Sequence, residues 1–87
     1  SFKGGDKVLV VSAQGHYKLV DPDLALRFDG DMKIIQKWNP KRPISIIYYD
    51  GYKNQLNIKR FIPEMSTKKV LFITEHEKSY LELATSV

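Results

Sequence analysis

Short apolar runs, rich in β-branched and aromatic residues and each ended by Gly, Pro or Asp, follow one another along this chain of 87 residues. No stretch shows the i, i+3, i+4 spacing of an amphipathic helix. Strands at such short intervals, with turn residues between them, are typical of a sandwich, a barrel or a propeller. The sequence therefore predicts one small all-β, antiparallel domain spanning residues 1–87.

The expected strands cover residues 7–12, 16–20, 32–38, 44–49, 55–62, 70–74 and 79–85. The strongest is 44–49, because five of its six residues are β-branched or aromatic, and we expect it in the middle of a sheet. Asp50-Gly51 predicts a hairpin back to 55–62, where a slip of the apolar phase at 59–61 indicates a bulge. A first hairpin is expected over residues 7–20 and a last one over 70–85. Residues 24–28 fit either one helical turn or an extended connector.

The two ends of the chain resemble each other. Lys7-Val8-Leu9-Val10-Val11-Ser12 aligns with Lys69-Val70-Leu71-Phe72-Ile73-Thr74, 62 residues further on. A period of roughly 40–60 residues with four strands is typical of propeller blades. Residues 5–65 would then form one blade-like repeat and 66–87 the first hairpin of the next, about one and a half units in all. Alternatively, the two segments are apolar β-runs that resemble each other by chance, and the chain has no repeat.

Charge gives the first indication of a partner. Fourteen Lys and Arg against ten Asp and Glu leave a net charge of +4, which favours a polyanion. The segment 33–42 holds four cations and no acid, and Lys33 and Lys37 share a face of a regular strand because they are an even number apart. A strand face that is merely solvated can have the same four cations. We expect Trp38, which lies in the same segment, to pack in the core. The candidate phosphate-contacting residues are Lys33, Lys37, Lys41, Arg42, Lys59 and Arg60.

Catalytic and metal-binding patterns are missing from the sequence. The chain has no cysteine, and two histidines, His16 and His76, are too few for a zinc site. The aspartates of 21–31 lack the spacing of a calcium loop, and neither a phosphate-binding glycine loop nor a Ser/His/Asp set is present. We therefore expect no cofactor, no metal and no catalysis by this chain. The longest apolar run has four residues, so no membrane span is expected, and the absence of cysteine and of a leader favours the cytoplasm.

Several segments together resemble one family. Val8-Leu9-Val10-Val11-Ser12-Ala13-Gln14-Gly15-His16-Tyr17-Lys18 resembles the hairpin that recurs in blades of the C-terminal domain of type IIA topoisomerase A subunits, which are those of gyrase and topoisomerase IV. Residues 38–44, 48–51, 58–61 and 74–82 are similar to the topoisomerase IV-like A subunits of the Bacteroidetes group. The likeness runs from about residue 5 to residue 85.

This resemblance implies a β-pinwheel whose rim binds duplex DNA without reading its sequence. It implies a parent that is an ATP-dependent type IIA DNA topoisomerase, with the rest of the A subunit and an ATPase B subunit as partners, in the nucleoid of the bacterial cytoplasm. Residues 27–32 lack the basic, glycine-rich box of gyrases, which favours relaxation and decatenation over supercoiling. The family cleaves DNA with a tyrosine that follows an arginine in another domain, and none of the five tyrosines here follows one.

Two further expectations follow from the residues. The tyrosines at 17, 48, 49, 52 and 80 are expected to pack and to pair across strands. An incomplete blade leaves strand edges uncovered, so we expect the chain to form a strand-swapped homo-oligomer. The alternative function is a small SH3-like β-barrel that binds a peptide or protein, with Tyr48, Tyr49 and Tyr52 lining an exposed groove.

Overall fold

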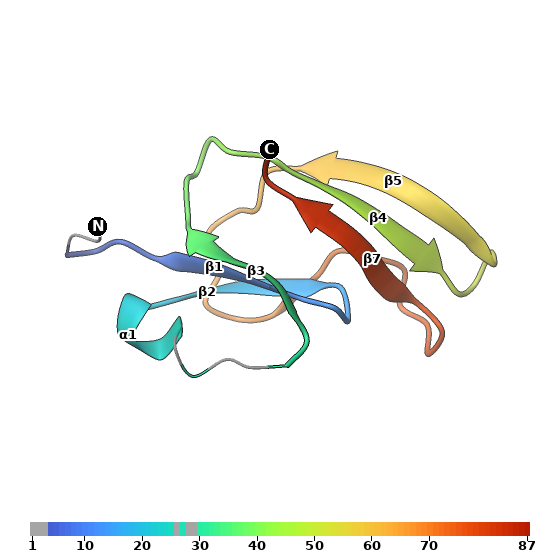
Figure 1. Ribbon diagram of the computed structural model, residues 1–87, viewed down its shortest axis with the longest axis horizontal. Helices are drawn as coiled ribbons and strands as arrows, with labels where there is room; N and C mark the ends of the chain where they lie inside the picture. The colour runs from blue at the N-terminus through green and yellow to red at the C-terminus, as the bar shows by residue number, and fades with distance from the viewer. Residues whose placement is uncertain (1–3, 26, 28–29) are drawn as a thin grey trace.

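Seven strands and one helical turn form the described part of the chain in the computed structural model, which is residues 4–25, 27 and 30–87 (Figure 1). The elements are β1 (Val8–Ser12), β2 (His16–Val20), α1 (Pro22–Ala25), β3 (Met32–Lys37), β4 (Ile44–Asp50), β5 (Gln55–Phe61), β6 (Val70–Leu71) and β7 (Tyr80–Thr85). The all-β prediction is confirmed. Residues 22–25 form one turn of helix, whereas residues 26 and 28 of the ambiguous segment lie outside the described residues.

The strands form two antiparallel sheets. Sheet A has the order β3-β1-β2-β6, and sheet B has the order β5-β4-β7. The predicted central position of residues 44–49 is confirmed, because β4 pairs with β5 on one side and with β7 on the other. The predicted first hairpin is also confirmed: β1 and β2 pair around a tight turn that ends at Gly15. Gly15 has a φ of +89°, and a Cβ there would overlap the side chain of Ile73, so only glycine fits.

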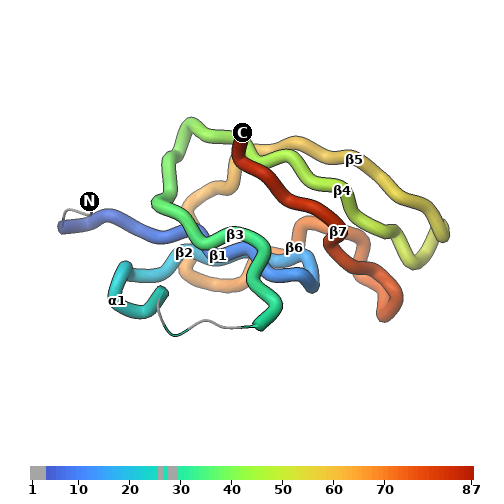
Figure 2. The backbone as a smooth tube through the Cα atoms, viewed as in Figure 1, coloured from blue at the N-terminus to red at the C-terminus, as the bar shows by residue number. Residues whose placement is uncertain are grey.

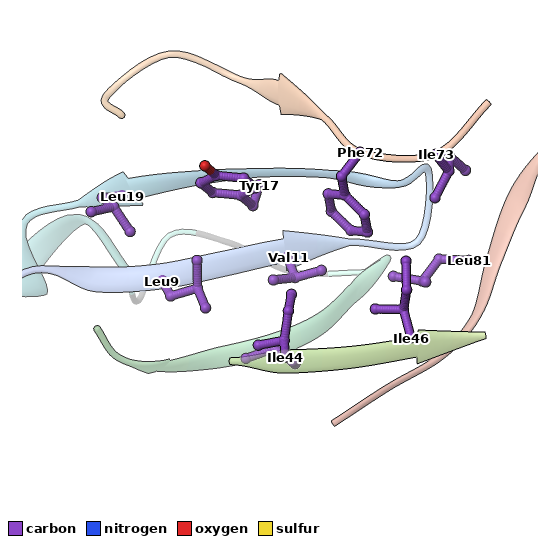
Figure 3. Close-up of a cluster of buried hydrophobic side chains, with 10 residues drawn as sticks. Leu9, Val11, Tyr17, Leu19, Ile44, Ile46, Phe72, Ile73 and Leu81 are labelled. Carbon is purple, nitrogen blue, oxygen red and sulfur yellow. The ribbon is translucent and has the colours of Figure 1, made fainter. Parts of the chain in front are cut away.

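The two sheets pack face to face around one hydrophobic core (Figure 3). Sheet A contributes Leu9 and Val11 from β1 and Leu19 from β2, while Ile44 and Ile46 of β4 close the core from sheet B. Val8 and Val10 point the other way and are buried with Ala25 of α1. Both faces of β1 are therefore covered, which explains why its sequence is apolar without alternation.

The last two strands lie in different sheets, so the predicted hairpin over residues 70–85 is wrong. β6 pairs with β2 at the edge of sheet A, and β7 pairs with β4 in sheet B (Figure 2). Between them the buried Phe72 and Ile73 turn into the core, and the Phe72 N–H donates to the carbonyl oxygen of Gly15 at 2.9 Å. The two similar segments also differ in role, because β1 is an interior strand and β6 is a two-residue edge strand. The division into repeats at residue 65 stays a prediction.

The predicted bulge at residues 59–61 is wrong as well. β4 and β5 pair without a register shift from Ile44↔Phe61 to Asp50↔Gln55. The apolar phase changes because Phe61 faces the core, whereas Leu56 and Ile58 lie on the opposite face of the same strand. The register shifts occur elsewhere, at Val11/Ser12 against β3 and at Ile47/Tyr48 against β7.

The outer face of sheet B carries two rows of apolar side chains that the described residues leave uncovered. One row is Ile58, Ile47 and Leu83, and the other is Leu56, Tyr49 and Tyr80, as the strand register places them. Ile58 is 82 % exposed, and Tyr49 and Tyr80 stack with ring centroids 5.5 Å apart. We call this surface the outer apolar face.

Candidate nucleic-acid interface

Four of the predicted cations lie along one continuous piece of chain. Lys33 and Lys37 are on β3, the edge strand of sheet A, and Lys41 and Arg42 are on the loop 38–43 that leads to β4 in sheet B. All four residues are exposed. We call Lys33, Lys37, Lys41 and Arg42 the cationic strip.

The loop 38–43 is held in one shape by its own residues. Pro40 and Pro43 fix two φ angles, and Asn39 accepts hydrogen bonds from the Lys41 N–H through its side chain at 2.9 Å and from the Arg42 N–H through its carbonyl at 3.0 Å. Trp38 packs against the core, as predicted, and its Nε1–H donates to the carbonyl oxygen of Pro63 at 3.0 Å. The cations of this loop are thus presented from a fixed backbone.

A hollow of about 320 Å³ opens between the two halves of the strip. Lys37 and Arg42 line it together with Trp38, Asn39 and Pro40. The Lys37 ammonium also lies 3.3 Å from an Asp6 carboxylate oxygen. An anion seated in this hollow would meet one cation from the sheet edge and one from the loop.

The prediction that Lys33 and Lys37 share one strand face, because they are an even number of residues apart, fails at Lys33. Ile34 pairs with Val11 and Met32 pairs with Ser12, so the register shift leaves Lys33 between two paired residues. A two-residue period does not run through such a bulge. Lys33 and Lys37 therefore share an edge strand, but their spacing does not place them on one face.

The predicted cations of β5 lie apart from the strip, on the far edge strand of sheet B. Arg60 is exposed and donates from Nη1 to Ser45 Oγ at 3.0 Å, close to where the loop 38–43 enters β4. Lys59 faces the other side, where its ammonium donates to the carbonyl oxygen of Phe72 at 2.8 Å and lies 5.4 Å from the Phe61 ring centroid. Arg60 therefore lies near the strip, whereas the exposed Lys59 has its ammonium bound to the Phe72 carbonyl.

A second cationic site, which the sequence did not reveal, lies on the outer face of sheet A. A hollow of about 330 Å³ is lined there by Val10, Ser12, Gln14, His16, Lys18 and Lys69, with Met32 at its edge. Burial lowers the pKa of His16 from its ordinary 6.5, and the charges of Lys69 and Lys18 lower it further. We call this site the β1–β2 hollow. Its lysines are 51 residues apart, and only the pairing of β2 with β6 brings them together, which no local pattern predicts.

The tyrosines mostly pack, as expected. Tyr17 is buried, donates from its hydroxyl to the carbonyl oxygen of Glu64 at 3.0 Å, and has a pKa raised by that burial. Tyr48 packs against the core, whereas Tyr49 lies on the opposite face of β4. Tyr52 is 76 % exposed on the β4–β5 turn, so for this residue the packing prediction is wrong. The three tyrosines of 48–52 do not line one groove, which removes the basis of the peptide-binding alternative.

The described residues offer neither a cluster of metal ligands nor a membrane-spanning helix. None of their His, Cys, Asp and Glu side chains gather in threes as a metal ion would need. No helix in that part of the chain is long and apolar enough to cross a membrane. Of the segment that was compared with the gyrase box, Phe28 and Asp29 lie outside the described residues.

Two open antiparallel sheets around one core, with exposed cations on an edge strand and a fixed loop, define a blade-like all-β domain with a basic surface. Comparison with protein families gives its relationship: a family model described as the topoisomerase C-terminal domain of Bacteroidota matches residues 1–87. The chain belongs to this family of topoisomerase C-terminal domains, and the resemblance seen in the sequence is confirmed. No curated protein and no solved structure matches the chain.

Proposed function

We propose that this domain binds duplex DNA without sequence preference and thereby assists a topoisomerase in changing DNA topology. The observation that carries the proposal is the cationic strip, four exposed cations on an edge strand and a fixed loop in a topoisomerase C-terminal domain. Lys and Arg side chains neutralise backbone phosphates and release counterions, which gives binding without base readout. The one described helix is a single turn, far too short to read the major groove.

The parent we propose is the A subunit of an ATP-dependent type IIA enzyme of the topoisomerase IV type, which relaxes and decatenates DNA with an ATPase B subunit in the bacterial nucleoid. In that setting the two open sheets would be part of a β-pinwheel. The domain would hold one DNA segment for the strand-passing core. Arg60 would extend the strip across Ser45, while Lys59 would contribute least because its ammonium is bound to the Phe72 carbonyl.

A pair of matched charge reversals tests the strip. Lys41→Glu with Arg42→Glu removes two cations from the loop, and Lys53→Glu with Lys78→Glu removes two exposed cations beyond the other end of β4. Seven residues of strand separate the two pairs by about 20 Å. Both variants have the same net charge, so a general loss of positive charge affects them equally.

The measurement is the salt dependence of binding to a duplex of arbitrary sequence, by fluorescence anisotropy. Contact with three or four phosphates gives the unmodified chain a log–log slope of about −3, and the loop variant is expected to lose about 2 of it. The control pair should keep nearly the whole slope. Equal loss in both pairs would mean that only net charge matters, and binding that does not respond to salt would contradict the proposal.

We also propose that the isolated chain forms a homo-oligomer. β5 has seven residues and pairs on one side only within the described residues, and its exposed Leu56 and Ile58 make it a long apolar edge of the kind that recruits a second copy. Sedimentation equilibrium should show association that rises with concentration. Ile58→Lys should reduce this association, and a monomer at every concentration would contradict it.

A further inference from the structure

The β1–β2 hollow brings like charges together. Leu71 pairs with His16 and Val70 pairs with Tyr17, so continuing the register by one residue sets Lys69 against Lys18. Both lysines line the hollow and both act on the imidazole of His16. Like charges opposite each other on neighbouring strands destabilise a sheet. An anion between them would remove that repulsion.

The floor and the wall of the hollow are firmly built. Val10 and Ser12 of β1 form the floor with 3 % and 1 % of their surface exposed. Ser12 Oγ lies 3.0 Å from Nδ1 of His16 and 3.3 Å from the His16 carbonyl oxygen, to which it donates. The imidazole is thus tied to a buried hydroxyl and keeps its place between the two lysines. The ring is therefore held in position before a ligand arrives.

An acidic side chain reaches the rim of this site. Asp31 accepts a hydrogen bond from Nε2 of Gln14 at 2.9 Å, at the rim of the hollow. Among the described residues that line the hollow itself, the charged ones are Lys18 and Lys69. The lining therefore presents two ammonium groups, and the Asp31 carboxylate at the rim is engaged by an amide.

We propose that the β1–β2 hollow is a binding site for one phosphate group, held between Lys18 and Lys69 with His16 as the third wall. Several oxygens on one tetrahedral centre suit donors that approach from separate segments of the chain, and charge-assisted hydrogen bonds to ammonium groups are the strong ones. A volume of about 330 Å³ accommodates such a group. The site is distinct from the cationic strip and does not depend on the DNA-binding proposal, since a free phosphate and a DNA backbone phosphate share the chemistry.

The probe is inorganic phosphate, titrated at constant ionic strength against the 87-residue chain while the ring signals of its two histidines are followed by NMR. The His16 signals are expected to shift along a saturating curve and the His76 signals to stay in place, because His76 lies in the loop before β7. The bound anion should also raise the pKa of His16 by offsetting Lys18 and Lys69. A linear response, or equal shifts of both rings, would overturn the proposal.

Variants identify the groups that hold the anion. Lys18→Gln with Lys69→Gln should weaken phosphate binding by about tenfold, and Lys53→Gln with Lys78→Gln should leave it unchanged. If the double variant unfolds, Lys69→Gln alone serves in its place, because Lys69 is exposed and lies outside the strands, and Lys69→Arg should restore binding. Unchanged affinity in a folded Lys69→Gln variant would overturn the assignment.

A short duplex identifies the source of the phosphate. The duplex is added to the unmodified chain and, at higher concentration, to the Lys41→Glu, Arg42→Glu variant. If the His16 signals shift in both, the hollow takes a backbone phosphate. If they shift with inorganic phosphate alone, the site takes a free phosphate or a small phosphorylated ligand. Either result supports the site, and loss of DNA binding at the strip leaves the phosphate titration unaffected, so the two proposals fail separately.

Discussion

The outer faces of the two sheets differ in what lies on them. On sheet A, α1 packs against Val8 and Val10, and the cationic β1–β2 hollow lies on the same face. On sheet B, four side chains of the outer apolar face are exposed, with Ile58 82 % exposed and Leu83 52 % exposed. Apolar residues on the outer face of sheet A are therefore covered by α1, whereas those on the outer face of sheet B are exposed. Apolar character alone does not show whether a strand face contributes to the stability of the fold.

The comparison predicts its largest effect within sheet B itself. Ile46 is 1 % exposed on the inner face of β4, and Ile58 is 82 % exposed on the outer face of β5. Ile46→Ala should lower the free energy of unfolding by about 2–5 kcal/mol, because it leaves a cavity in the core. Ile58→Ala should change it by less than about 0.5 kcal/mol, as surface substitutions do. Urea denaturation of both variants in dilute solution measures the difference, and a large loss for Ile58→Ala would show that a partner already covers this face.

A smaller effect is expected on the outer face of sheet A. Val10 is 3 % exposed, and it is buried together with Ala25 of α1. Val10→Ala should cost about 2 kcal/mol, since burial there is nearly as complete as in the main core. The same urea series checks it. If Val10→Ala behaves like Ile58→Ala, the single helical turn does not cover sheet A in solution and the contrast between the outer faces disappears.

The smallest effect concerns charge on sheet A. Burial, Lys69 and Lys18 hold the pKa of His16 below its unfolded value of 6.5, with Ser12 beside the ring and Asp31 bound to Gln14 at the rim. The folded chain thus binds fewer protons, so this contribution to stability is present above the unfolded pKa and is lost as the pH falls through the folded one. The fall in unfolding free energy between about pH 7.5 and pH 5.5 should be smaller in Lys69→Gln than in the unmodified chain. An equal fall in both would mean that Lys69 does not act on His16.

The sequence predicted the fold well where neighbouring segments decide it. The hairpin of residues 7–20 and the pairing of 44–49 with 55–62 follow from short loops and apolar runs, and both are confirmed. It failed where distant segments pair. Nothing local to Val70 or Tyr80 shows that one joins β2 and the other joins β4. The phase change before Phe61 predicts a bulge only when the other face of the strand is polar, and in β5 that face carries the exposed Leu56 and Ile58.

The candidate sites divide in the same way. The cationic strip could be named from the sequence because its four residues lie within ten positions of each other. The β1–β2 hollow could not, since it needs Lys69 beside Lys18. The pairing of Val10 with Lys18 in the first hairpin, which places Lys18 above a buried strand, was the one local signal.

The split of the last two strands has a consequence for how the chain is made. β7 is the third strand of sheet B and β6 is the fourth strand of sheet A, so both sheets wait for residues 70–85 to leave the ribosome. At ordinary translation rates of about 5–20 residues per second, the first hairpin is exposed for seconds before its last partners arrive. During that time the core side of β1 and β4 faces water or a chaperone. Pairings over such long sequence separations also slow folding, so this domain is expected to fold only after its last strand has been made.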